Sequence, residues 1–319
     1  MINQKKLLVS HAPFVHYGSS ISERSYNIIL AALLAVIPGF MRYGAPAVGV
    51  VALSISTAII WEVLMNFATK RTISVGNGNA AVIGMIFAMM LPATTPWWII
   101  IIGTFLAVVV GKEIFGGIGA NPFNPVLVSF AMIMLSWGDL IDFNAALIHY
   151  DLGFNMAYPL IAAKQLGTMA ADTYSIRDLI LGLQSGGIGS TFGIGIIVGG
   201  LYLIIRGFIR WEISISFLLG IFITASIFKY VQPNVYACPF FHLFTGYTLI
   251  GAFYLATEDS SSPANFIPMI IYGAGCGIMT VLIRNIGAYV DGVVFAVLLM
   301  NLINPIIDKI RPRALGKVK

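Results

Sequence analysis

The first candidate functional residues lie in a stretch from Gly111 to Pro125, between two hydrophobic runs. Its glycines and prolines break a helix and free backbone groups, which hydrocarbon tolerates only where protein or water satisfies them. Asn121 and Asn124 could present amides and freed carbonyls to a bound group or a hydrated cation. The alternative is that both side chains only cap a kinked helix.

Acidic groups give a second set of candidates. Thr257, Glu258 and Asp259 end a hydrophobic run and offer oxygen ligands for a cation on an ion pathway. A Ser-Ser-Ser-Pro sequence follows, which is typical of loops, so a solvated acid pair is the alternative. Arg284 and Asp291 are close enough in sequence to pair across a turn, and a structural salt bridge is the simpler interpretation.

These candidates belong to a membrane protein. With 58% hydrophobic and only 10% charged residues, and a mean hydropathy of +0.90, the chain lies outside the range of soluble domains. Its two cysteines have no CxxC spacing, so neither a disulfide framework nor a metal site is expected. No nucleophile–base pair, paired-carboxylate site or basic-aromatic cluster is present, so we expect neither catalysis by this chain alone nor nucleic-acid binding.

Hydrophobic runs long enough to span a bilayer, or half of it before a break, number ten. A cytoplasmic start places most lysines and arginines on the cytoplasmic side, as the positive-inside rule expects, and predicts a multi-pass inner-membrane protein with both termini cytoplasmic. Glu62, Lys112 and Glu113 fall near cytoplasmic ends, where snorkelling of their side chains explains them. The runs cover residues 27–41, 46–66, 79–93, 97–111, 122–137, 191–206, 213–229, 240–256, 265–283 and 292–307.

The two halves of the chain are related. Gly84 and Gly251 lie 167 residues apart, as do Pro96 and Pro263, and a shared offset indicates duplication. Because five spans per half is an odd number, the second copy must be inverted. We therefore predict an all-α polytopic protein of ten transmembrane helices in two inverted five-helix repeats, with broken helices meeting near the midplane.

The expected breaks and domains follow from this repeat. The breaks lie at 76–79, 92–96 and 111–125 in the first half, and at 242–246, 257–263 and 287–292 in the second. A long external loop rich in tyrosine and phenylalanine joins the halves, and we expect it to be functional. The domains are a cytoplasmic segment 1–25, a first repeat 26–137, the external loop 138–190, a second repeat 191–307 and a basic cytoplasmic tail 308–319.

The motifs in this order resemble those of the D subunit of Rnf-type ion-translocating complexes and the B subunit of sodium-pumping NADH:quinone reductases. The resemblance covers nearly the full length, and each motif alone is weak while their order and spacing together are specific. Two motifs lie in the first half: the His-containing start at 10–16 and the stretch 116–125 with its Asn-x-Phe-Asn-Pro ending. The others are 178–182; 199–206 followed by Trp211; His242 together with Gly246 and 251–253; and 291–301 ahead of Pro305.

The resemblance implies a membrane subunit of an ion-translocating oxidoreductase, ferredoxin or NAD linked, that passes electrons through flavin and moves Na⁺ or H⁺. Family members carry FMN on a threonine of the external loop, but Tyr158 stands at that position here and Asn155 replaces the preceding Ser/Thr. This departure argues against covalent attachment, so FMN or riboflavin held without a tether is expected, with Tyr158 stacking on it. The cofactor-binding candidates are Tyr158, Thr168, Thr173, Asn121, Asn124, Thr245, Gly246 and Asp291.

Partners are required, because the chain has no nicotinamide-binding region and no iron–sulfur motif. We expect an external flavoprotein subunit, a cytoplasmic NAD-linked subunit, other integral subunits and membrane lipid. Two other functions fit the same inverted-repeat fold: a redox-inactive channel or carrier for a small solute, and a structural membrane anchor for flavoprotein subunits.

Overall fold

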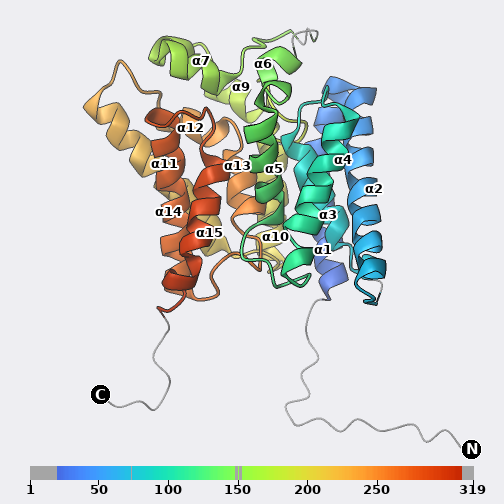
Figure 1. Ribbon diagram of the computed structural model, residues 1–319. Coiled ribbons are helices and arrows are strands. Elements are labelled where there is room, and N and C mark those ends of the chain that lie inside the picture. The colour runs from blue at the N-terminus through green and yellow to red at the C-terminus, as the bar shows by residue number, and fades with distance from the viewer. Residues whose placement is uncertain (1–19, 73, 148–149, 151–152, 311–319) are drawn as a thin grey trace, which may run out of the picture.

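The computed structural model describes residues 20–72, 74–147, 150 and 153–310, and all regular secondary structure in these residues is helical. Helices of the first half of the chain form one side of the bundle and those of the second half the other, with α5, α10 and α13 between them (Figure 1). We call the end of the bundle at which α1 begins the inner end. The opposite end, which carries the loop of residues 138–190, is the outer end.

In the first half, local sequence signals fix where helices begin. Ser20 caps the first helix by accepting from the Glu23 amide, and Pro46 and Pro125 stand in the first turns of two others. The break predicted at 111–125 is present as a short 3₁₀ turn, Glu113–Phe115, followed by glycines with positive φ. The helices are α1 (Ile21–Tyr43), α2 (Ala45–Ala68), α3 (Asn79–Met90), α4 (Trp97–Phe105, continued by a π turn at Leu106–Val110) and α5 (Pro125–Ser136).

The loop between the halves is folded across the outer end. Tyr174 donates a hydrogen bond to the Ala157 carbonyl over 2.8 Å, and the Tyr158 amide donates to Asn144 Oδ1 over 2.7 Å. Its short helices lie against the outer ends of the second-half helices (Figure 1). They are α6 (Phe143–Ala146), α7 (Pro159–Leu166), α8 (Thr168–Ala171) and α9 (Ile176–Ile180).

The second half contains the most strongly broken helix. The run predicted at 240–256 is not one helix but two short ones and a π turn, separated by an unwound segment at 245–247. The elements are α10 (Gly193–Ile205), α11 (Trp211–Val231), α12 (Pro239–Phe244), α13 (Thr248–Ile250, continued by a π turn at Gly251–Leu255), α14 (Phe266–Asn285) and α15 (Val293–Ile307).

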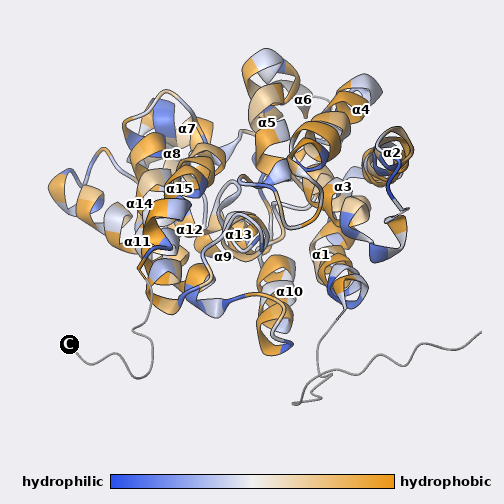
Figure 2. Ribbon diagram, turned by 60° about the horizontal axis from the view of Figure 1, so that its bottom comes forward, coloured by the Kyte–Doolittle hydropathy of each residue, from blue (hydrophilic) through white to orange (hydrophobic). Residues whose placement is uncertain are grey.

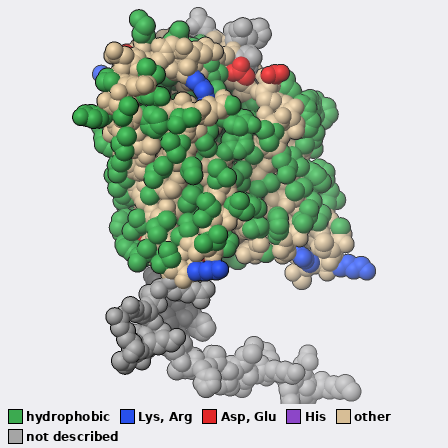
Figure 3. Space-filling view, turned by 60° about the vertical axis from the view of Figure 1, so that its left-hand side comes forward, with side chains coloured by type: hydrophobic (Ala, Val, Ile, Leu, Met, Phe, Trp, Pro, Cys, Tyr) green, Lys and Arg blue, Asp and Glu red, His purple; other side chains and the backbone are tan. Residues whose placement is uncertain are grey.

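Length and composition make this a membrane fold. Five helical segments are long and apolar enough to cross a bilayer, namely Ile21–Tyr43, Ala45–Ala68, Trp97–Phe115, Trp211–Val231 and Phe266–Asn285. Four apolar helices are shorter: α3, α5, α10 and α15. Apolar residues are found all around the helices (Figure 2), and on one face they form a broad band with charged side chains near its upper and lower edges (Figure 3).

The packing of two long helices, α11 against α14, depends on glycine. A Cβ added to Gly220 would lie 2.7 Å from the Ala274 carbonyl oxygen, which is backbone and cannot move aside. Small residues let helix backbones approach in membranes, where van der Waals packing drives association.

We therefore expect Gly220→Ala to destabilise the protein by about 1–3 kcal/mol, the usual size of an overpacking effect. Gly49→Ala is the matched control, because nothing lies within 4 Å of its added Cβ and alanine favours a helix. Thermal unfolding in detergent should show a lowered midpoint for the first variant and an unchanged or raised one for the second. Equal midpoints would contradict the close crossing.

Candidate functional site

The unwound segment at 245–247, between α12 and α13, is here called the outer break. Arg284 supplies the hydrogen bonds that this segment lacks. Its side chain is 2% exposed, at the end of α14. Its Nη1 donates to the His242 carbonyl over 2.9 Å, and its Nη2 donates to Thr248 Oγ1 over 2.9 Å and the Thr245 carbonyl over 3.3 Å. The guanidinium thus satisfies carbonyls freed at the end of α12, where the helix dipole favours positive charge.

Asp291 completes this site from the other side. Its Oδ1 accepts from Arg284 Nη2 over 2.8 Å and from the Val293 amide over 3.2 Å, while Oδ2 accepts from the Tyr247 amide over 2.7 Å. One carboxylate therefore satisfies amides at the starts of both α13 and α15, where negative charge is favoured. The predicted pairing of Arg284 with Asp291 is present, and it holds the break in shape.

Gly246 is required at this break. It has a φ of +65°, and an added Cβ would lie 2.7 Å from Leu160 Cδ1 and 3.0 Å from Arg284 Nη2. Thr245 beside it donates to the Phe241 carbonyl over 2.7 Å. The structure thus brings together Thr245, Gly246 and Asp291, three of the predicted cofactor-binding residues.

Tyr158 lies nearby but is packed inside the protein. It is 4% exposed, and its ring is tilted against Phe143 with 4.9 Å between centroids. The other loop candidates lie elsewhere: Thr168 donates to the Asn234 carbonyl over 2.9 Å, and Thr173 is exposed in the turn between α8 and α9. Asp151 and Leu152, which precede Asn155 and Tyr158 in the loop, lie outside the described residues, as does the segment with His11 and His16.

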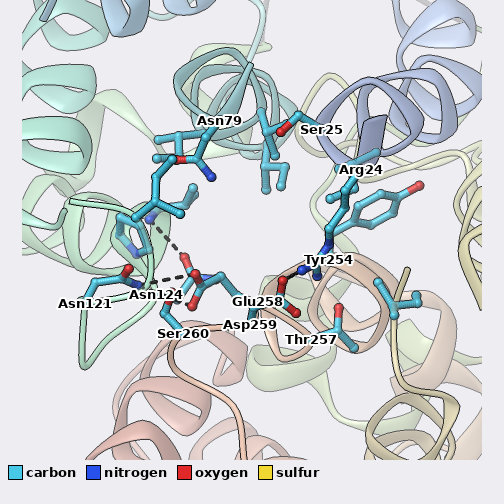
Figure 4. Close-up of a pocket in the computed structure, with 18 of the residues that line it drawn as sticks. Arg24, Ser25, Asn79, Asn121, Asn124, Tyr254, Thr257, Glu258, Asp259 and Ser260 are labelled. Carbon is cyan, nitrogen blue, oxygen red and sulfur yellow. Dashed lines mark hydrogen bonds and ion pairs between the residues drawn. The ribbon is translucent and has the colours of Figure 1, made fainter. Parts of the chain in front are cut away.

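A second group of candidates meets around an inner pocket of about 150 Å³. The pocket lies between α1, α3, the 112–126 segment and residues 253–260, so both halves of the chain build it. Asn121, Asn124, Thr257, Glu258 and Asp259 all line it, and their side chains surround an open centre (Figure 4). The structure therefore brings together the predicted ion-pathway residues and two cofactor candidates.

The two asparagines join the halves. Asn121 Nδ2 donates to both Glu258 carboxylate oxygens over 3.3 Å, and Asn124 Nδ2 donates to the Leu255 carbonyl over 2.9 Å. Asn124 Oδ1 also accepts from the Val126 and Leu127 amides, which caps α5. Asn124 therefore caps α5, as the alternative interpretation expected, and the same side chain also bonds the π turn of the other half.

Some polar atoms around the inner pocket have no partner. Arg24 forms an ion pair with Asp259 across the pocket mouth, yet its buried Nε has no hydrogen bond, and neither has the buried hydroxyl of Tyr254. Apolar side chains, among them Ile28, Val82, Ile83, Ile86 and Phe253, form the rest of the wall. Unpartnered buried donors beside an apolar wall are the features of a site that holds an amphipathic ligand.

A buried charge cluster borders this pocket and corrects the expectation of snorkelling. Lys112 is 1% exposed and Glu62 0%, and Lys112 Nζ lies 2.6 Å from Glu62 Oε1 and 3.4 Å from Glu113 Oε1. Ser74 also donates to Glu62 over 3.1 Å. Glu62 and Lys112 do not reach water, because they lie on different elements that pack against each other. The sequence of one span alone does not show this packing.

Breaking the outer pair should destabilise the protein strongly. Arg284→Met or Asp291→Asn leaves a buried charge or freed carbonyls without partners, which costs roughly 3–5 kcal/mol for buried ion pairs. Arg206→Met is the control, since Arg206 and Glu23 are 3.5 Å apart with side chains 51% and 48% exposed, and such pairs contribute at most about 1 kcal/mol. Thermal unfolding midpoints should fall far more for the first two variants, and similar shifts for all three would refute the role of the pair.

The sequence matches a known family over nearly its full length. The model of the NQR2, RnfD, RnfE family matches residues 8–316. The D subunit of the Na⁺-translocating ferredoxin:NAD⁺ oxidoreductase complex of Acetobacterium woodii is 33% identical, over 97% of this chain and 94% of that protein. The D subunit of the ion-translocating oxidoreductase complex of Pectobacterium carotovorum is 33% identical over 97% and 98% of the two chains. The proton-translocating counterpart of Clostridium ljungdahlii is 30% identical over 97% and 95%. The chain therefore belongs to the NQR2, RnfD, RnfE family.

Proposed function

We propose that this chain is the D-type membrane subunit of an ion-translocating oxidoreductase complex, in which flavin bound to the inner pocket passes electrons coupled to Na⁺ or H⁺ movement. The observation that carries the proposal is that unwound segments of both halves meet at the inner pocket, through the bond from Asn124 to the Leu255 carbonyl. Relatives named for sodium and for proton translocation support the ion-coupled role.

The membrane arrangement that we propose is ten spans in two inverted repeats, with both termini cytoplasmic. The order of elements supports it, because an offset near 167 residues sets α2 against α11 and α5 against α15. Arg206 pairs with Glu23 and Arg71 donates to the Gly116 carbonyl, so these cations gather at the inner end beside the start of α1. A cytoplasmic inner end agrees with the positive-inside rule.

The inner pocket fits a flavin by its chemistry. Apolar walls from α3 and Phe253 suit an aromatic ring system, and the unpartnered Arg24 Nε, the unpartnered Tyr254 hydroxyl and the Asn121 amide suit its polar edge. A bound flavin supplies one- and two-electron redox chemistry. The protein side chains orient it, exclude water and set the local charge.

Charge in the pocket provides the link to ion movement. Lys112 and Arg24 are already paired with carboxylates, so negative charge that arrives in the low-dielectric pocket would favour a compensating cation, for which Glu258 supplies carboxylate oxygens. Moving one charge against the membrane potential requires about 2.3 kcal/mol per 100 mV. The partners in this proposal are an external flavoprotein subunit and a cytoplasmic NAD-linked subunit, which supply and remove the electrons.

The proposal predicts that the purified subunit contains flavin and that acid releases this flavin. An absorption spectrum taken before and after acid precipitation separates three results: flavin in the supernatant supports bound cofactor, flavin in the pellet means covalent attachment, and no flavin favours a channel or an anchor. Thr168→Ala and Thr173→Ala show whether any flavin in the pellet is attached in the external loop.

Asn121→Ala should weaken flavin retention by roughly tenfold, because it removes a hydrogen-bonding amide from the pocket wall. Cation uptake into vesicles should fall with it. Asn234→Ala is the matched control, since Asn234 is exposed and does not line the inner pocket. Unchanged flavin content and uptake in Asn121→Ala would place the cofactor elsewhere.

A further inference from the structure

The inner pocket has a mouth at the inner end of the bundle. Most residues that line the pocket are buried or half-buried, so the exposed ones mark where water reaches it. They come from the start of α1, from the 112–126 segment and from the turn that follows residue 257, and they are Ile21, Ile118, Gly119 and Asp259. The pocket is therefore entered between elements of both halves.

An ion pair spans this mouth. Arg24, in the first turn of α1, pairs with Asp259, which follows the π turn of the second half, and both residues line the pocket (Figure 4). Each half of the chain thus supplies one of the two charges. While the pair is formed, the two side chains lie across the opening and narrow the way in.

The exposure of this pair makes it easy to break. The side chain of Asp259 is 62% exposed and that of Arg24 is 22% exposed. Those of Arg284 and Asp291, the ion pair at the outer break, are 2% and 7% exposed. Water and salt therefore screen the attraction between Arg24 and Asp259, and exposed ion pairs are weak. Thermal motion can separate the two side chains while the rest of the fold stays intact.

The backbone beside Asp259 is held in place, so opening needs only side chains to move. Glu258 accepts a hydrogen bond from the Ser261 amide over 2.9 Å, and Asn304 donates to the Ser261 carbonyl over 2.9 Å. The buried Nε of Arg24 has no hydrogen bond while the pair is formed. Because an unpaired buried donor is unfavourable, this lowers the free-energy cost of leaving the closed arrangement.

From these contacts we propose that the ion pair between Arg24 and Asp259 is a latch on the inner pocket. When the pair is formed, it closes the pocket to water and solutes at the inner end, and when the side chains separate, the pocket opens. Because the latch joins the two halves, a movement of one half against the other would also open it. The proposal concerns access to the pocket whatever ligand the pocket holds, so it goes beyond the proposed function.

The test measures how fast a cysteine inside the pocket reacts with a neutral, water-soluble maleimide in the purified full-length chain. Val82→Cys supplies this cysteine, because Val82 lines the pocket, is 8% exposed, and cysteine packs as a small hydrophobe. Cys238 is replaced by alanine, and Cys276 is kept because it is fully buried. Ser25→Cys, at another buried lining position, takes the place of Val82→Cys if that variant does not fold.

Reversing either charge should open the latch. In the Val82→Cys chain, Arg24→Glu and Asp259→Arg should each speed labelling about two- to fivefold, as expected on losing an exposed ion pair. The double variant should label as slowly as Val82→Cys alone, because the pair forms again with its charges exchanged. Glu23→Gln is the matched control, since it breaks the pair with Arg206 at the same end of the bundle and Glu23 does not line the pocket.

Salt gives a second readout that leaves both charges in place. An ionic strength of about 1 M shortens the screening length to about 3 Å, so it should speed labelling of Val82→Cys. It should not speed labelling of the Arg24→Glu variant, in which two carboxylates face each other. Thermal unfolding shows which variants are folded.

The latch is overturned if folded charge-reversal variants label no faster than Val82→Cys, if Glu23→Gln speeds labelling equally, or if the double variant stays as fast as the single ones. If the charge-reversal variants do not fold, an unchanged rate at high salt overturns it. Flavin content and cation uptake do not enter these measurements, so failure of the latch is separate from failure of the proposed function.

Discussion

The structure depends on the buried ion pair between Arg284 and Asp291, because the backbone groups freed where the helix unwinds are buried and must find hydrogen bonds away from water. The guanidinium satisfies carbonyls at the end of α12, and the carboxylate satisfies amides at the starts of α13 and α15. Each charge lies at the helix terminus whose dipole it complements. This arrangement lets a half-helix end at Phe244 without leaving its backbone unpaired.

At the break in residues 111–125, beside the inner pocket, neutral side chains bond the backbone groups that the helix leaves free. Asn124 caps α5 with its oxygen and reaches the Leu255 carbonyl with its nitrogen, so one amide serves both halves. Positive-φ glycines between 116 and 119 carry the chain around the turn before it. Part of this break, including Gly119, Asn121 and Asn124, lines the inner pocket, so the irregular backbone also makes room for a ligand.

Much of this fold could be predicted from the sequence, because the signals are local. Apolar runs indicated the long helices, and clusters of glycine, proline and asparagine marked the breaks at 111–125 and 287–292. Arg284 and Asp291 are close enough in the chain for their pairing to be anticipated. The bond from Lys112 to Glu62 joins residues 50 positions apart, and that from Asn124 to Leu255 joins residues 131 apart, so both depend on packing that no local pattern encodes. The cavity between α7 and α14, lined by Lys164 and Arg284, was missed for the same reason, since these helices are brought together only in the folded chain.

The link from Asn124 to Leu255 also has a mechanical consequence. Together with Asn121 and Glu258, it ties the two halves at their inner end. Tyr247 adds a second tie by donating to the Met90 carbonyl over 2.9 Å, so a tilt of one half against the other would have to break one of these bonds. At the outer end, the loop of residues 138–190 joins the two halves and would limit how far they tilt against each other.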